Sequence, residues 1–76
     1  MITPSPLTAK QQAVYLTVVQ YYAATGEPCS LSYLVRRLKR DRKTILEHLD
    51  GIVRKGWVTA STPAFRRVLE YKSRSG

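Results

Sequence analysis

The sequence predicts an α+β domain that is mainly helical, in which three helices precede a two-stranded β-hairpin. Apolar residues recur at helical spacing in three segments between residues 8 and 55. Beyond Gly56, aromatic and β-branched residues lie on both sides of the turn former Pro63, which is typical of a hairpin. At 76 residues, the chain is long enough for one domain with a thin core.

The first helix is predicted over about residues 8–24. Thr8 and Gln11 have the spacing of a capping box, in which each side chain accepts a hydrogen bond from the other residue's backbone N–H. Gly26 suits the left-handed residue beyond a helix end, and Pro28 stops the helix from continuing. The apolar stripe of this helix consists of Val14, Tyr15, Val18, Val19, Tyr21 and Tyr22.

Two shorter helices follow, and each has a capping residue at its start. Ser30 precedes the second helix, and Asp41 precedes the third, which is predicted over about residues 41–55 and is ended by Gly56. Their buried stripes are Leu31, Leu34, Val35 and Leu38 in the second helix and Ile45, Leu49, Ile52 and Val53 in the third.

The hairpin is predicted over about residues 57–71, around Pro63. The whole domain would then span residues 7–72. Residues 1–6, which are broken by prolines, and residues 73–76 are expected to be flexible tails.

Charge is the strongest global signal. Thirteen Lys and Arg residues face five Asp and Glu residues, and the net charge is +8. Residues 1–30 hold only Lys10 and Glu27, so the whole excess lies in residues 31–76. Such asymmetry favours a polyanionic partner, with nucleic acid first and an anionic membrane second.

Several other functions are not expected. There is no apolar run long enough to span a membrane. With one cysteine and one histidine, no metal set, cofactor or small-molecule ligand is expected. Glu47 and His48 are adjacent on a helix and diverge by about 100°, so they form no catalytic pair, and we expect no enzyme. Cys29 is expected to be a loop thiol or a half-buried thiol, which fits a reducing cytoplasm.

Three helices followed by a two-stranded ribbon is the order of a winged helix-turn-helix. The short link between the second and third helices forces a sharp crossing. The outward face of the third helix is predicted to carry Lys43, Thr44, Glu47 and Arg54, with Gly51 at its middle. Glycine inside a helix costs about 1 kcal/mol relative to alanine, so Gly51 favours a helix pressed against a partner, or else it is a neutral accident.

Specific residues also match a known family. They are Leu7-Thr8-Ala9-Lys10-Gln11-Gln12, Val14, Thr25-Gly26, Pro28, Arg37-Leu38, Glu47-His48-Leu49 and Arg54-Lys55-Gly56. In these residues the chain resembles the N-terminal DNA-binding domain of LexA repressors, over roughly residues 7–58. Lys39 stands where that family has glycine. The LexA autoprotease domain has no counterpart in the sequence, so cleavage-triggered derepression is not expected.

The resemblance implies that the third helix is the recognition helix and that a hairpin wing follows it. Carried over, the base-reading positions fall at Arg42, Lys43, Thr44, Leu46 and Glu47. Only Glu47 keeps the family's identity, so the LexA operator is not the expected target. The cations expected near DNA phosphates are Arg36, Arg37, Lys39, Arg40, Arg54 and Lys55, and those expected on the wing are Arg66 and Arg67.

The predicted function is therefore sequence-specific binding of double-stranded DNA by a small transcription regulator, such as a phage or bacterial repressor, in the cytoplasm at the nucleoid. The third helix would enter the major groove, and the wing would contact the backbone or the minor groove. A homodimer or a second regulator would lengthen the site that is read. The alternative is a winged-helix protein-interaction module, an adaptor or antirepressor, that uses the five tyrosines and Trp57 as a contact surface.

Overall fold

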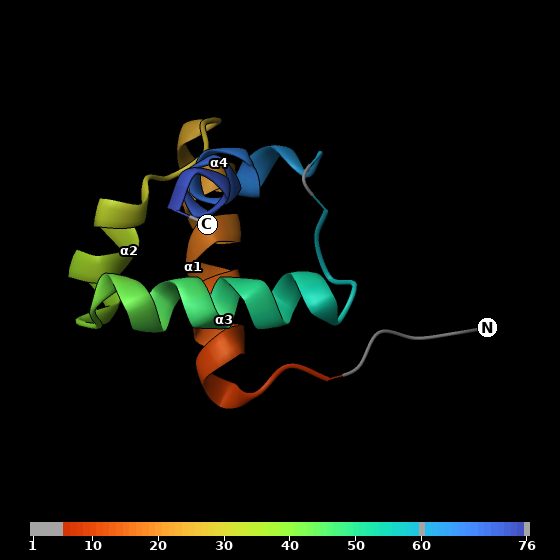
Figure 1. Cartoon of the computed structure of the whole chain (residues 1–76). Helices are drawn as coiled ribbons and strands as arrows, with labels where there is room; N and C mark the ends of the chain where they lie inside the picture. Colours follow the sequence, from red (N-terminus) through yellow and green to blue (C-terminus); the bar gives the residue numbers. More distant parts are fainter. Residues whose placement is uncertain (1–5, 60, 76) are drawn as a thin grey trace.

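The computed structural model describes residues 6–59 and 61–75. Over these residues the chain forms four α-helices and one short 3-10 helix (Figure 1). The elements are α1 (Ala9–Thr25), α2 (Leu31–Leu38), α3 (Arg42–Arg54), η1 (Pro63–Phe65) and α4 (Arg66–Ser75). In Figure 1, α3 crosses α1 near the N-terminal end of α1, and α2 stands beside them at the start of α3. η1 packs on α1, and α4 packs on α2 and η1.

The starts of the first three helices agree with the sequence prediction. Thr8 Oγ1 accepts from the Gln11 amide at 3.1 Å, and Gln11 Oε1 accepts from the Thr8 amide at 3.1 Å, which completes the capping box. Ser30 Oγ accepts from the Tyr33 amide at 3.2 Å and caps α2. Because these caps involve residues three apart, they can be recognised from the sequence alone.

Asp41 caps α3, as predicted. Its Oδ1 accepts from the Thr44 amide at 3.3 Å. Hydrogen bonding from the Thr44 side chain, followed by smaller contributions from backbone hydrogen bonds and Lys43, lowers the pKa of this exposed carboxyl below 3.8. The carboxylate is therefore ionised at neutral pH, which suits the positive end of a helix dipole.

The predicted hairpin is wrong. Between Gly56 and the end of the described chain there is no strand, and the expected second strand is η1 followed by α4. Thr59 and Phe65 instead form local backbone hydrogen bonds. The Thr59 amide donates to Thr62 Oγ1 at 3.0 Å, and the Phe65 amide donates to the Thr62 carbonyl oxygen at 3.1 Å. Over residues 6–59 and 61–75 the fold is therefore all-helical and has no wing.

Pro63 is the source of the error. It was interpreted as a hairpin turn, but it stands at the first position of η1. Proline is favoured there, because that position needs no backbone N–H. The buried residues that follow are Ala64, Phe65 and Val68. Their spacing is helical, so one face of η1 and α4 closes over the core.

The predicted tails lie at the edges of the described chain. α4 includes residues 73–75, where the sequence predicted a flexible tail. Residues 1–5 and Gly76 lie outside the described residues. Pro6, at the end of the expected N-terminal tail, accepts a hydrogen bond from α3's C-cap residue Lys55 through its carbonyl oxygen at 2.9 Å.

The core is built from every described helix. Phe65 is completely buried, and its ring stacks on Tyr15 of α1 with a centroid separation of 5.6 Å. Trp57 meets the same tyrosine edge-on at 5.5 Å, although 39% of its surface stays exposed. The buried residues of this core are Val14, Val18, Cys29, Leu31, Leu34, Ile45, Leu49, Ile52, Val58, Ala64, Phe65 and Val68.

Cys29 lies in the loop before α2, as predicted, but it is fully buried rather than half-buried. Burial raises the pKa of its thiol from 9.0 to about 11. The thiol is therefore protonated at neutral pH, and the low accessible thiolate fraction makes it a poor nucleophile.

This burial leads to a pH-dependent prediction. Because the folded-state pKa is raised, the contribution of Cys29 to stability is complete below pH 9 and is lost as the pH rises from about 9 to about 11. We expect the unfolding free energy of the parent to fall by about 2 kcal/mol more than that of a Cys29→Ala variant across this window. Urea unfolding of both proteins between pH 8 and 11 measures the difference, and parallel pH profiles would contradict it.

Candidate nucleic-acid interface

The link between α2 and α3 is a tight turn. α2 ends at Leu38, and Asp41 already caps α3, so only two residues separate the helix from the cap. Lys39 has φ 56° and ψ 44°, the left-handed conformation, and its amide donates to the Val35 carbonyl oxygen. A lysine thus adopts a conformation that glycine adopts more easily.

We expect Lys39→Gly to stabilise the fold by about 0.5–1 kcal/mol. The left-handed conformation costs a residue with a Cβ roughly 1–2 kcal/mol, and the extra freedom of glycine in the unfolded chain offsets about half of that. Thermal unfolding should therefore shift upward by about 2–8 °C. Lys39→Ala is the control, because it removes the charge and keeps the Cβ. Equal melting temperatures for the two variants would contradict the assignment of strain at this turn.

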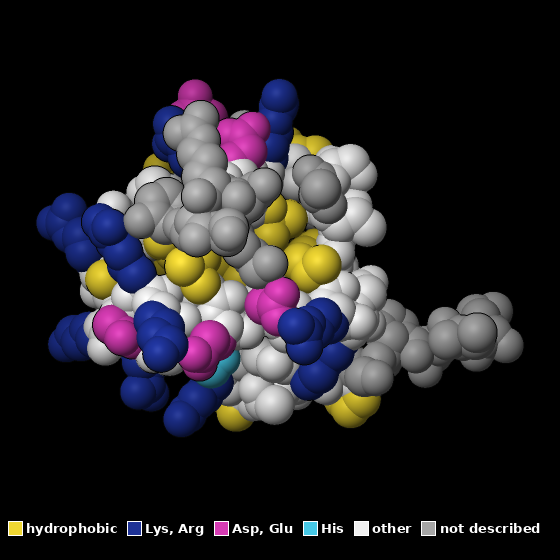
Figure 2. Space-filling model, viewed as in Figure 1, with side chains coloured by type: hydrophobic (Ala, Val, Ile, Leu, Met, Phe, Trp, Pro, Cys, Tyr) yellow, Lys and Arg dark blue, Asp and Glu magenta, His cyan; other side chains and the backbone are white. Residues whose placement is uncertain are grey.

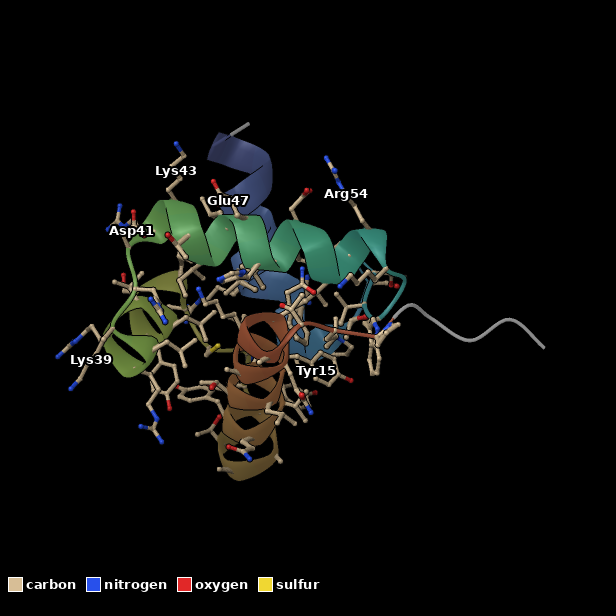
Figure 3. All side chains as sticks on the ribbon, turned by 90° about the horizontal axis from the view of Figure 1, so that it is seen from below. Tyr15, Lys39, Asp41, Lys43, Glu47 and Arg54 are labelled. Atoms are coloured by element: carbon tan, nitrogen blue, oxygen red, sulfur yellow. The ribbon has the colours of Figure 1, made fainter. Side chains whose placement is uncertain are left out.

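One face of α3 projects away from α1 and carries charged side chains. Lys43, Glu47 and Arg54 all point to this side in Figure 3. All three residues are exposed. Arg54 Nε lies 2.8 Å from Asp50 Oδ2, one turn earlier on the helix. The face therefore combines cations with acceptors along one side of the helix, as the sequence predicted for Lys43, Glu47 and Arg54.

The predicted base-reading residues divide into two groups. Arg42, Lys43 and Glu47 are exposed on α3. Thr44 is half-buried, and its amide donates to the Asp41 cap. Leu46 is also half-buried and packs against the core. The structure thus brings Lys43 and Glu47 together on the exposed face of α3. Much of the Leu46 side chain instead packs against the core.

Gly51 has an explanation inside the molecule. A Cβ added there would collide with Gln11 Nε2 and would lie 3.2 Å from Gln11 Cδ. Gly51 therefore faces α1 and allows the close approach of α1 and α3, which is a different role from the contact with an external partner that its helical position suggested. The pairing joins residues 40 positions apart and left no trace in the local sequence pattern.

Lys55 also has partners within the chain. Its Nζ donates to Gln11 Oε1 at 2.7 Å and to the Pro6 carbonyl oxygen at 2.9 Å. The same Gln11 oxygen accepts from the Thr8 amide. Lys55 therefore ties the residue that follows α3 to the segment that leads into α1. The sequence had placed this cation near DNA phosphates, and these contacts hold its ammonium group at the α1–α3 junction.

The remaining predicted backbone cations gather around the turn. Six cations and one acid lie in residues 36–43, a net charge of +5. We call the six the turn cluster: Arg36, Arg37, Lys39, Arg40, Arg42 and Lys43. All six residues are exposed. Figure 2 shows Lys and Arg side chains concentrated over the side of the molecule where α2 meets the start of α3.

The two arginines expected on the wing lie elsewhere. Arg66 and Arg67 begin α4 and line a shallow hollow with Pro28 and Glu70. Pro28 belongs to the loop that follows the C-terminal end of α1, whereas α3 crosses α1 near its N-terminal end (Figure 1). Arg66 Nε lies 3.8 Å from Glu70 Oε1. These arginines are therefore neither on a wing nor beside the exposed face of α3.

Two residues outside the predicted set of DNA contacts lie beside Arg40 of the turn cluster. Lys10 of α1 and His48 of α3 line one pocket with Arg40. Their positions in the sequence are far apart, so only the packing of α1 against α3 brings them together. His48 itself is half-buried.

Among the described residues, no helix is both long enough and apolar enough to cross a membrane. No curated protein and no solved structure matches the chain. A family model described as a helix-turn-helix domain matches residues 6–58, which include α1, the turn and all of α3. Nothing in this match points to LexA repressors in particular. Because the match covers more than half of the chain, the protein belongs to the helix-turn-helix domain family, and this membership indicates that it binds DNA.

Proposed function

We propose that this protein binds specific sequences of double-stranded DNA by inserting α3 into the major groove, and that it acts as a small transcription regulator without catalytic activity. The observation that carries the proposal is the exposed face of α3, where Lys43, Glu47 and Arg54 project together beside the turn cluster. The B-DNA major groove is wide enough to admit one α-helix.

Lys43 and Glu47 are the proposed base readers. They stand one helical turn apart, so both can face one stretch of base edges. A lysine ammonium donates to O6 and N7 of guanine, and a glutamate accepts from N4 of cytosine. The resemblance to LexA repressors supports the same half of α3, since Glu47 is the base-reading position at which the two agree.

The proposed phosphate contacts come from the four residues of the turn cluster that precede α3, namely Arg36, Arg37, Lys39 and Arg40. Their charges lie next to the N-terminal half of α3, so they would face the phosphates that border the occupied groove. Lys55 is left out of this set, because its ammonium group is held by Gln11 and Pro6. A single domain reads a short site, so two copies or a second regulator would supply further specificity.

A protein-binding module remains the second candidate, and one observation favours it. Leu16, Val19 and Trp57 are the large hydrophobic residues that stay exposed in the described chain, at 43%, 37% and 39% of their surfaces. Leu16 and Trp57 line the same hollow with Pro6 and Leu7. An apolar partner could dock there, since aromatic side chains are enriched in interface cores.

Selection from a random pool of double-stranded DNA, followed by sequencing, tests the proposal. We expect one enriched motif, and an affinity for it that falls steeply between about 50 and 200 mM salt because bound phosphates release counterions. If no motif is enriched and the binding to DNA is negligible at low salt, DNA recognition is excluded and the protein-binding candidate takes its place.

A further inference from the structure

A small pocket lies where α1, the turn and α3 meet. Lys10 contributes from the first turn of α1, Arg40 from the turn and His48 from the middle of α3. The volume is about 170 Å³, and the rest of the lining is Ala13, Val14 and Leu38. This volume is below the roughly 300 Å³ at which pockets for drug-sized ligands begin, so a small group fits it better.

The polar groups around this pocket lack partners within the described part of the chain. His48 is one of the lining residues, and its Nε2 is buried without a hydrogen bond. Lys10 and Arg40 are exposed, and their side chains form no ion pair or hydrogen bond with another described residue. No acidic residue lines the pocket. A buried polar atom without a partner calls for an explanation, and a bound group is one of the usual ones.

We propose that this pocket binds a phosphate group. Arg40 and Lys10 supply charge-assisted donors from two different elements, and the His48 imidazole supplies a third polar contact at the wall after a small movement of its ring. Two positive charges in a lining that contains no carboxylate would attract an anion and repel a cation. The lining alone supports this binding, whether the phosphate belongs to DNA or to a free phosphorylated molecule.

The assignment of that phosphate to the DNA backbone rests on the proposed function. His48 follows Glu47 on α3, so the two side chains diverge by about 100° around the helix. With Glu47 facing base edges, His48 faces the border of the groove, where a sugar-phosphate backbone runs. α1 passes the same border, because Gln11, next to Lys10, contacts α3 at Gly51.

Titration with inorganic phosphate tests the pocket without DNA. NMR spectroscopy follows the ring nitrogen signals and the carbon-bound ring proton signals of His48, which is the only histidine in the sequence. For the parent we expect a saturable change in these signals with phosphate at constant ionic strength and pH, and no such change with chloride. The Lys10→Gln/Arg40→Gln variant should lose it. An absence of saturable change in the parent would overturn the inference.

A second arm uses DNA and a matched control. Lys10→Gln and Arg66→Gln each remove one positive charge from an exposed residue, but only Lys10 lines the pocket. We expect Lys10→Gln to weaken DNA binding by about three- to tenfold at low salt and to reduce the magnitude of the salt slope by about one. Arg66→Gln should change both by less than half as much.

The combined outcomes separate the two claims. If the parent responds to phosphate, Lys10→Gln/Arg40→Gln loses that response, and Lys10→Gln has a smaller DNA salt slope, the pocket holds a backbone phosphate. A phosphate response with an unchanged slope supports the pocket and assigns it to a free phosphorylated molecule. A phosphate response in a protein that does not bind DNA overturns the proposed function alone. DNA binding without any phosphate response overturns the pocket alone.

Discussion

Phe65→Ala is expected to destabilise the protein by about 3–5 kcal/mol, because it empties the largest fully buried side-chain position of the core. The ring is stacked on Tyr15, and its loss would leave a cavity between η1 and α1. A small domain has a total stability of about 5–15 kcal/mol, so much of the folding free energy would be lost. Urea unfolding followed by circular dichroism measures the change.

Two variants accompany this measurement. Phe65→Leu keeps an apolar side chain of similar bulk and should cost roughly half as much. Arg66→Ala, at the next position but exposed, should change stability by no more than about 0.5 kcal/mol. If Phe65→Ala costs less than about 1 kcal/mol, then η1 does not complete the core and the helical description of residues 63–75 is wrong.

The second large effect concerns affinity for DNA. Arg37→Gln with Arg40→Gln removes two cations of the turn cluster, and the removal of each cation that neutralises a phosphate should lower the magnitude of the salt slope by about one. At physiological salt we expect the affinity for the selected DNA to fall by roughly ten- to a hundredfold, since each such cation contributes about fivefold. Fluorescence anisotropy at several salt concentrations measures both quantities.

The chain offers a control with the same change in charge. Arg66→Gln with Arg67→Gln also removes two cations, but these lie beside Pro28 and Glu70 at the far end of α1 from α3. Exposed charges farther than about 10 Å from the DNA are largely screened, so the control should lose only a few-fold in affinity. Equal losses from the two pairs would mean that net charge, rather than the turn cluster, accounts for the binding.

The helical part of the fold could be predicted because its signals are local. The Thr8–Gln11 capping box, the Ser30 and Asp41 caps and the left-handed Gly26 each depend on residues a few positions apart. The predicted bounds of the first and third helices therefore match α1 and α3 to within about one residue, and α2 begins directly after its predicted cap. The short link between α2 and α3 was equally visible in the sequence.

The C-terminal region was mispredicted because the prediction followed its strand-favouring residue types rather than the helical spacing of its apolar residues. Trp57, Val58 and Thr59 suit a strand, and Pro63 suits a turn. The apolar residues from Ala64 onward, however, repeat at helical intervals, and proline followed by such a repeat also marks a helix start. Packing decided between the two structures: η1 and α4 cover the core, whereas an isolated two-stranded hairpin is only marginally stable.

The features of the candidate site that depend on sequence spacing could be predicted. The features that depend on tertiary contacts could not. Lys43 and Glu47 share a face because helical periodicity places them there, and the turn cluster is contiguous in sequence. Lys55 and Gly51 both contact Gln11, and these contacts depend on how α1 crosses α3. The pocket between Lys10 and His48 depends on the same crossing, and no sequence spacing encodes it.

The central claim is that the exposed face of α3 reads bases, and a panel of single-base variants of the selected DNA site tests it most directly. The affinities of the parent, Lys43→Ala and Glu47→Ala for every member are compared, after circular dichroism has shown that each variant is folded. We expect each variant to lose discrimination of about 1–3 kcal/mol at one or two base pairs and to keep the parent's preferences elsewhere. If both variants rank every DNA sequence as the parent does, α3 is not the reading element.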